Sequence, residues 1–186
     1  LAFAQVLAEI PIQDQTVFII PVLNISGFNK KSRWEVSQGN IYDPNRDYPG
    51  PCGTEGPHHL KSTASLAHFL IQEEIVTSAT LHTFFPAVTY PWGFATTDLS
   101  TPYDDLFRTL SHLAVLESGY AYGNSTELIY PAAGTFEDYA FWKHGIWSLL
   151  FELGYSHYPS LTDLEKMIRE NIPGLRNFLM NAPRER

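Results

Sequence analysis

Two residues of this chain close β-like runs, where strand ends commonly place side chains that do chemistry. His82 lies in Ala79-Thr80-Leu81-His82-Thr83-Phe84, and Glu152 lies in Ser148-Leu-Leu-Phe-Glu-Leu153. A neutral imidazole is a common metal ligand, and an ionised carboxylate is costly to bury unless it is paired or bound to a metal. Each residue also has an ordinary interpretation: His82 as a structural side chain, and Glu152 on the wet outer face of a strand.

The elements that must position these residues alternate between strands and helices. Apolar runs predict strands at 16–23, 75–84, 87–94 and 148–153. Helical spacing predicts helices at 1–10 and 61–74, one capped by Thr101-Pro102, and one over 160–180 that is interrupted near Pro173. The Gly-, Pro- and Asn-rich stretch 24–57 is expected to be a long functional loop. This alternation predicts an α/β domain with a mixed, mostly parallel sheet flanked by helices, and open sheets of this kind bind ligands at the carboxyl ends of their strands.

Composition narrows the class of protein. The 186 residues are 44% hydrophobic and 17% charged, which suits one globular domain with a real core. The net charge of -8, without a large Lys/Arg cluster, argues against a nucleic-acid partner. No apolar run is long enough for a membrane span. The single cysteine, Cys52, cannot form an internal disulfide, so it does not report the compartment.

Five short motifs in register give the chain a family resemblance. They are Asn24-Ile-Ser-Gly-Phe28, Tyr42-Asp-Pro-Asn-Arg-Asp47, Thr80-Leu-His-Thr-Phe84 with Tyr90-Pro-Trp-Gly-Phe94, Ile129-Tyr-Pro-Ala-Ala-Gly134 with Glu137-Asp-Tyr139, and Phe151-Glu-Leu153. In this order they resemble the carboxyl-terminal part of the zinc metallocarboxypeptidases of the carboxypeptidase A and B type. The tail Glu152-Leu-Gly-Tyr-Ser-His-Tyr-Pro159 is more similar to the regulatory branch than to the digestive one. The resemblance implies residues 1–186 as the C-terminal part of one catalytic domain, incomplete at its N-terminus.

The resemblance also implies roles for individual residues. His82 matches a zinc ligand, and Glu152 matches the general base that takes a proton from water and passes it to the leaving amine. Asn45 and Arg46 match the pair that holds the terminal carboxylate of the substrate, a task that suits the planar fork of arginine.

Three further matches concern the rest of the substrate. Arg33 matches the arginine that stabilises the oxyanion, and Tyr130 matches the tyrosine that closes over the substrate. Glu137 matches the floor of the pocket for the terminal side chain, where an acidic group would favour Lys or Arg. The alternative for Glu137 is an exposed glutamate on a loop. Asp43 matches a carboxylate that orients a zinc histidine, and its alternative is a turn residue before Pro44.

The chain departs from the family pattern most at its start. The other two zinc ligands belong to a His-x-x-Glu pair, and none of the seven histidines has Glu three residues on. The expected cofactor is zinc, and the expected partners are the C-terminus of a peptide or protein and a companion N-terminal segment that carries His-x-x-Glu. Smaller departures are Ser26, Asp47 and Phe84, none of which removes a catalytic group. The resemblance favours a secreted or extracytoplasmic protein.

Three functions remain open from the sequence. The first is zinc-dependent hydrolysis of C-terminal residues, basic ones if Glu137 forms the pocket floor, with this chain alone incomplete for catalysis. The second is a non-catalytic relative that binds C-termini, although such a binder needs neither His82 nor Glu152. The third is an amidase or deacylase of the same fold that acts on cell-wall peptides.

Overall fold

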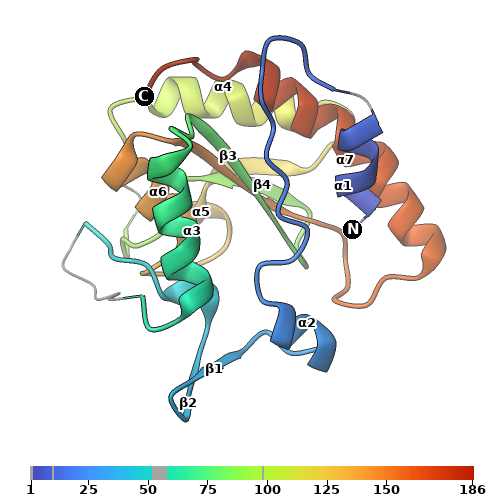
Figure 1. The fold of residues 1–186 in the computed structure, drawn as a ribbon. Coiled ribbons are helices and arrows are strands. Elements are labelled where there is room, and N and C mark those ends of the chain that lie inside the picture. Colours follow the sequence, from blue (N-terminus) through green and yellow to red (C-terminus); the bar gives the residue numbers. More distant parts are fainter. Residues whose placement is uncertain (1, 10, 52–57, 98) are drawn as a thin grey trace.

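A mixed four-stranded sheet forms the centre of the computed structural model, which describes residues 2–9, 11–51, 58–97 and 99–186 (Figure 1). The strands are β3 (Thr77–His82), β4 (Ala87–Tyr90), β5 (Ala121–Asn124) and β6 (Trp147–Glu152). Their order is β3-β6-β4-β5. β3 runs parallel to β6 and β4 parallel to β5, while β4 and β6 are antiparallel. The predicted fold class is therefore confirmed.

Burial explains why the central strands form where they do. β6 is apolar from Trp147 to Phe151 except for Ser148, and all five residues are buried, while β4 is buried along its whole length. Such runs suit strands that are covered on both faces. β3 is less covered, and Leu81 near its end is 40% exposed.

Helices cover both faces of the sheet (Figure 1). They are α1 (Ala2–Glu9), α3 (Lys61–Gln72), α4 (Asp104–Val115), α5 (Ser125–Leu128), α6 (Phe136–His144) and α7 (Leu161–Asn181). The larger core cluster joins α4 and α7 to the sheet through residues such as Phe107, Phe151 and Phe178. A second cluster joins α3 and α6 around Tyr48 and Ile146. Of the described residues, no helix is both long and apolar enough to cross a membrane.

Three local predictions are wrong. The run 16–23 is extended but pairs with no strand, although its β-branched residues favour one. The N-cap of α4 is Tyr103 rather than Thr101, whose hydroxyl instead accepts a hydrogen bond from the Tyr103 amide at 3.1 Å. α7 continues through Pro173 without interruption. The helix has buried apolar residues on both sides of the proline, namely Ile172, Leu175 and Phe178, and their burial offsets the local cost of the proline.

The stretch 24–57 is more ordered than a plain loop. It contains α2 (Ile25–Lys30), the hairpin β1 (Glu35–Ser37) and β2 (Asn40–Tyr42), and the 3-10 turn η1 (Pro44–Arg46). Its last residues, 52–57, lie outside the described part of the chain. The turn η1 is the part that matters for the site, because it carries Asn45 and Arg46.

Candidate active site

His82 and Glu152 lie side by side at the carboxyl ends of two neighbouring parallel strands. They are paired in register, and the Leu153 amide donates to the His82 carbonyl at 2.9 Å. Ala87 of β4 is in register with Glu152 on the other side. The structure therefore brings together the two residues that the sequence singled out, at the edge where open α/β sheets bind ligands.

The environment of Glu152 suits a proton acceptor. Burial raises the pKa of its carboxyl above the ordinary value, His82 opposes that rise, and the negative charge of Glu137 adds to it. Within the described residues, the buried Oε2 atom of Glu152 has no hydrogen-bond partner. Buried polar atoms are usually paired, so an orphaned carboxylate oxygen at a strand end indicates a group awaiting a ligand or a reaction.

Asn45 and Arg46 are held in place by the turn η1. The Asp43 side chain caps this turn by accepting from the Asn45 amide at 3.0 Å. The Asn45 Oδ1 atom in turn accepts from the Phe136 amide at 2.8 Å, which ties the turn to the start of α6. The Arg46 Nη2 atom contacts the Tyr130 hydroxyl at 3.3 Å, and its guanidinium lies 5.9 Å from the Tyr130 ring centroid.

The backbone at Gly134 lies directly against the backbone of Arg46. Gly134 has a φ of +76°, and a Cβ atom built on it would lie 2.6 Å from the Arg46 carbonyl oxygen. The Tyr48 amide donates to the Gly134 carbonyl at 3.2 Å. Glycine is therefore required at position 134, both for its backbone conformation and for the close approach of η1.

Arg33 reaches this site from the chain before β1. Its guanidinium forms two contacts with the Asp43 carboxylate, at 2.6 Å from Nη2 and 2.7 Å from Nε. Burial alone would lower the pKa of Arg33, but the hydrogen bond and negative charge of Asp43 outweigh it, and Tyr130 and Glu152 also raise that pKa. The charge of Arg33 is thus felt by both Glu152 and Tyr130. Asp43 is more than a turn residue, since it holds Arg33 and η1 at once.

Tyr130 is exposed to solvent, whereas Glu137 is buried. Tyr130 is 52% exposed just after α5, and its hydroxyl contacts Arg46. Glu137 is 2% exposed in the first turn of α6, where it accepts a hydrogen bond from the Thr80 hydroxyl of β3. The alternative of an exposed loop glutamate is therefore wrong. The negative charge of Glu137 contributes to the raised pKa of Glu152.

Two buried aspartates support these elements: the sequence indicates a structural or supporting role for Asp138, and sequence reasoning missed the role of Asp47. Asp138 is 2% exposed and accepts twice from the Gly93 amide, at 2.9 and 3.1 Å. Asp47 is also 2% exposed and accepts from the His59 and Leu60 amides at 2.9 and 3.0 Å. Both lie within the motifs that carry the family resemblance, and that position was the available signal.

A model of the zinc carboxypeptidase family matches residues 9–174 of this chain. The chain belongs to the zinc carboxypeptidase family. It is 24% identical to carboxypeptidase SOL1 of Arabidopsis thaliana over 93% of this chain and 38% of that protein. It is 28% identical to human carboxypeptidase B over 73% of this chain and 40% of that protein. The chain therefore spans well under half the length of these curated relatives.

One solved structure has a similar arrangement of elements. The structure of bovine thrombin-activatable fibrinolysis inhibitor in complex with tick carboxypeptidase inhibitor superposes with a TM-score of 0.78 at 17% identity. The similarity covers 88% of this chain and 68% of that one. At this identity the similarity supports the fold alone.

Zinc binding needs more ligands than the described part of this family member offers. Across residues 2–9, 11–51, 58–97 and 99–186, no three His, Cys, Asp or Glu side chains gather closely enough to hold a metal ion. Catalytic zinc sites use three protein ligands and one open position. The residues present therefore do not by themselves fit a zinc ion, although His82 and the orphaned Glu152 carboxylate face the same strand end.

Proposed function

We propose that this chain is the part of a zinc carboxypeptidase that binds the substrate's C-terminus and supplies the general base. The observation that carries the proposal is the register pair of His82 and Glu152, with a buried, unpartnered carboxylate oxygen on Glu152. A module that only binds C-termini would have no use for this costly carboxylate, and the family match speaks for a peptidase over an amidase.

The clamp for the terminal carboxylate is formed by Arg46 and Asn45. Arg46 presents a planar guanidinium that can bind a carboxylate with two parallel hydrogen bonds. The Asn45 Oδ1 atom is engaged by the Phe136 amide, so its amide NH₂ group is turned to serve as a donor. Because the substrate must end at this clamp, hydrolysis would remove single C-terminal residues.

Three other residues of the chain act on the scissile bond. Glu152 takes the proton of the attacking water and returns it to the leaving amine, a role helped by its raised pKa. Arg33, fixed by Asp43, places its positive charge where the carbonyl oxygen becomes an oxyanion. Tyr130, exposed and in contact with Arg46, closes over the bound C-terminus.

Zinc would come to this site through His82 and two ligands from outside the described residues. We propose that a companion segment of the same protein carries them as a His-x-x-Glu pair. The length of the curated relatives, of which the chain covers 38–40%, supports a larger catalytic unit.

A preference for basic C-terminal residues would follow from Glu137. Its carboxylate is buried beneath the strand ends and is electrostatically coupled to Glu152. A Lys or Arg side chain that reached it would pair its positive charge with the Glu137 carboxylate, where the structure has only the neutral Thr80 hydroxyl as donor.

The test uses the complete gene product that contains this chain. We expect about one zinc per molecule by elemental analysis, and release of C-terminal Lys or Arg faster than Phe from otherwise identical peptides. Glu152→Gln should retain zinc while kcat falls by about 10²–10⁴-fold, the usual contribution of a general base. A protein without stoichiometric zinc, or a Glu152→Gln variant as active as the wild type, would refute the proposal. Faster release of Phe would refute only the role of Glu137.

A further inference from the structure

The hydroxyl of Tyr48 is a buried polar group that no step of the proposed reaction uses. Tyr48 lies just after the turn η1, and it is 1% exposed. Within the described residues, its hydroxyl oxygen has no hydrogen-bond partner. Buried tyrosine hydroxyls usually find a partner, because an unpaired one has given up its bonds to water without replacement. The orphaned hydroxyl therefore indicates a group that a bound molecule completes.

Tyr48 is held between the clamp and α6. Its amide donates to the Gly134 carbonyl at 3.2 Å. Its ring lies 5.4 Å from that of Phe136 and 5.3 Å from that of Tyr139, measured between centroids. Phe136 and Tyr139 flank Glu137 in the sequence of α6. Tyr48 is thus fixed against the segment that carries the proposed floor of the pocket.

The Glu137 carboxylate is the charged group with the largest effect on Tyr48. Burial is the main cause that raises the pKa of the Tyr48 phenol, and the negative charge of Glu137 follows, ahead of that of Asp47. A raised pKa keeps the phenol protonated, so the hydroxyl has one proton to donate and lone pairs with which to accept. Tyr48 and Glu137 are therefore neighbouring polar groups in buried surroundings.

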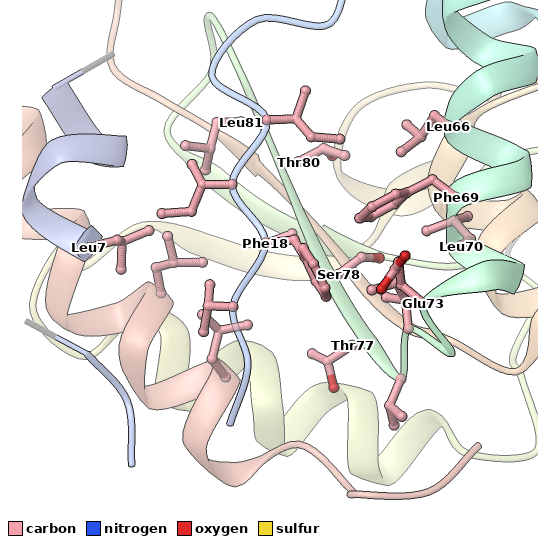
Figure 2. Close-up of a pocket in the computed structure, with 18 of the residues that line it drawn as sticks. Leu7, Phe18, Leu66, Phe69, Leu70, Glu73, Thr77, Ser78, Thr80 and Leu81 are labelled. Carbon is pink, nitrogen blue, oxygen red and sulfur yellow. The ribbon is translucent and has the colours of Figure 1, made fainter. Parts of the chain in front are cut away.

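Thr80 supplies a further polar group at Glu137. Its hydroxyl donates to the Glu137 Oε1 atom. Figure 2 shows Thr80 on β3, where it lines a cavity of about 690 Å³ together with apolar side chains of α3 such as Leu66 and Phe69. Because the hydroxyl proton is engaged by Glu137, the Thr80 oxygen keeps its lone pairs for another donor. The acidic floor is thus accompanied by two hydroxyl oxygens that can accept.

An ammonium group matches this set of acceptors. It carries three N–H donors, and each of them needs a partner when the group is buried. The Glu137 carboxylate supplies the opposite charge, and the Thr80 and Tyr48 hydroxyls supply the remaining acceptors. A guanidinium carries five donors, more than the oxygens of these three groups. One of its donors would therefore stay unpaired in the same place, at a cost that an ammonium avoids.

We propose that Tyr48 determines specificity in the pocket for the terminal side chain, where its hydroxyl joins Glu137 and Thr80 around the ammonium of a C-terminal lysine. The proposal rests on the proposed function, because the lysine enters as the last residue of a substrate held by Arg46. It goes beyond an acidic floor, because a carboxylate alone attracts any cation, whereas the two hydroxyls favour an ammonium over a guanidinium. The preferred substrates therefore end in lysine rather than arginine.

Binding of free amino acids to the complete gene product tests the site without requiring hydrolysis. By titration calorimetry, L-lysine is compared with L-arginine and with L-norleucine, which lacks the ammonium. We expect lysine to bind at least tenfold more tightly than either of the others. Tyr48→Phe should weaken lysine binding at least tenfold, the usual effect of one hydrogen bond to a charged group, and should leave norleucine binding within about twofold.

Tyr139→Phe is the matched control, because this neighbouring hydroxyl is already paired. It contacts the His144 Nε2 atom at 3.1 Å. Its removal should lower the urea midpoint and leave the ratio of lysine to norleucine affinity unchanged. Tyr48→Phe should keep or raise the midpoint, since the hydroxyl that it removes has no partner among the described residues. Unchanged lysine affinity in Tyr48→Phe, an equal loss for lysine and norleucine, or a lowered midpoint would overturn the proposal.

Peptide hydrolysis is measured on the same samples, so that the two proposals can fail separately. Lysine binding that depends on Tyr48, in a product that hydrolyses no peptide, would keep the site and remove the catalytic function. Hydrolysis by Tyr48→Phe with the same preference for lysine as the wild type would keep the function and remove the site. A wild type that prefers arginine to lysine would also overturn the role of Tyr48.

Discussion

Replacement of Asp47 should destabilise the protein more than any other single change at the edge of the site. Asp47 is 2% exposed, and its carboxylate accepts from the His59 amide at 2.9 Å, the Leu60 amide at 3.0 Å and the Thr63 hydroxyl at 2.5 Å. The N-cap residue of α3, Leu60, makes no side-chain cap of its own. Asp47 therefore ties the start of α3 to the turn that carries Arg46.

The expected cost follows from the donors that the change would leave unpaired. Asp47→Ala leaves several hydrogen-bond donors without their acceptor at once, and removal of one partner from a buried charged network costs about 3–5 kcal/mol. Asp47→Asn keeps the shape but turns an NH₂ group toward one pair of donors, which should cost about 1.5–3 kcal/mol. Thr63→Val removes one hydrogen bond and should cost about 1 kcal/mol.

Urea unfolding of the complete gene product measures these differences as shifts in midpoint at constant m. In a double-mutant cycle, Asp47→Asn and Thr63→Val should couple by about 1 kcal/mol, because the two side chains share a hydrogen bond. Asp163→Ala is the control, since that aspartate is exposed in the first turn of α7, where its carboxylate accepts from the hydroxyl of the N-cap residue Ser160, and its loss should cost under about 1 kcal/mol. A loss below about 1 kcal/mol for Asp47→Ala would refute the buried network.

Three further outcomes are expected. Arg46→Ala should lower kcat/KM for peptides by about 10²-fold, because one charge-assisted contact to a carboxylate is worth about 1.5–3 kcal/mol. Tyr130→Phe should lower it much less, because the Arg46–Tyr130 contact spans 3.3 Å. Peptides amidated at the C-terminus should not distinguish Arg46→Ala from the wild type. Gly134→Ala should destabilise the fold by more than about 2 kcal/mol, whereas Gly119→Ala should cost only about 1 kcal/mol. Both glycines have positive φ, but open space surrounds Gly119, while a Cβ at Gly134 would meet the Arg46 carbonyl oxygen. Equal midpoints in urea would contradict the close approach of Gly134 to Arg46. Burial raises the pKa of Asp138 from 3.8 to about 7, so the folded state binds more protons than the unfolded state. The free energy of unfolding should therefore fall as pH rises from about 4 to 7, by at most about 4 kcal/mol. Asp138→Asn should flatten this pH dependence, and an unchanged slope would show that Asp138 does not titrate in that range.

The elements that could be predicted are those whose buried face shows as a local pattern of apolar residues in the sequence. β6 reads as a continuous apolar run and α3 has an apolar stripe, so both were placed nearly to the residue. α6 was missed because its buried face includes Glu137 and Asp138, whose polar character hides the helix. The short β5 contains Gly123 and is stabilised by its partner β4 rather than by its own propensity.

The site was predictable in its residues but not in its supports. His82 and Glu152 stood out because each polar side chain closes an apolar run, and the structure pairs them in register. The roles of Asp43 and Asp47 depend on partners ten or more residues away, which no local pattern reports. The strand predicted at 16–23 failed for a related reason, since a strand is completed only by a neighbour.

The order of strands in the sheet constrains how the protein is assembled. β3 and β4 are joined by residues 83–86 alone, yet β6, from much later in the chain, lies between them. β6 must therefore enter a slot whose two sides are already linked, and its pairings are distant in sequence, which slows folding. A nascent chain that ends before Trp147 leaves β3 and β4 without their shared neighbour. Glu152 thus reaches its place opposite His82 only when β6 has paired with β3, so the pairing of these two residues cannot precede completion of the sheet.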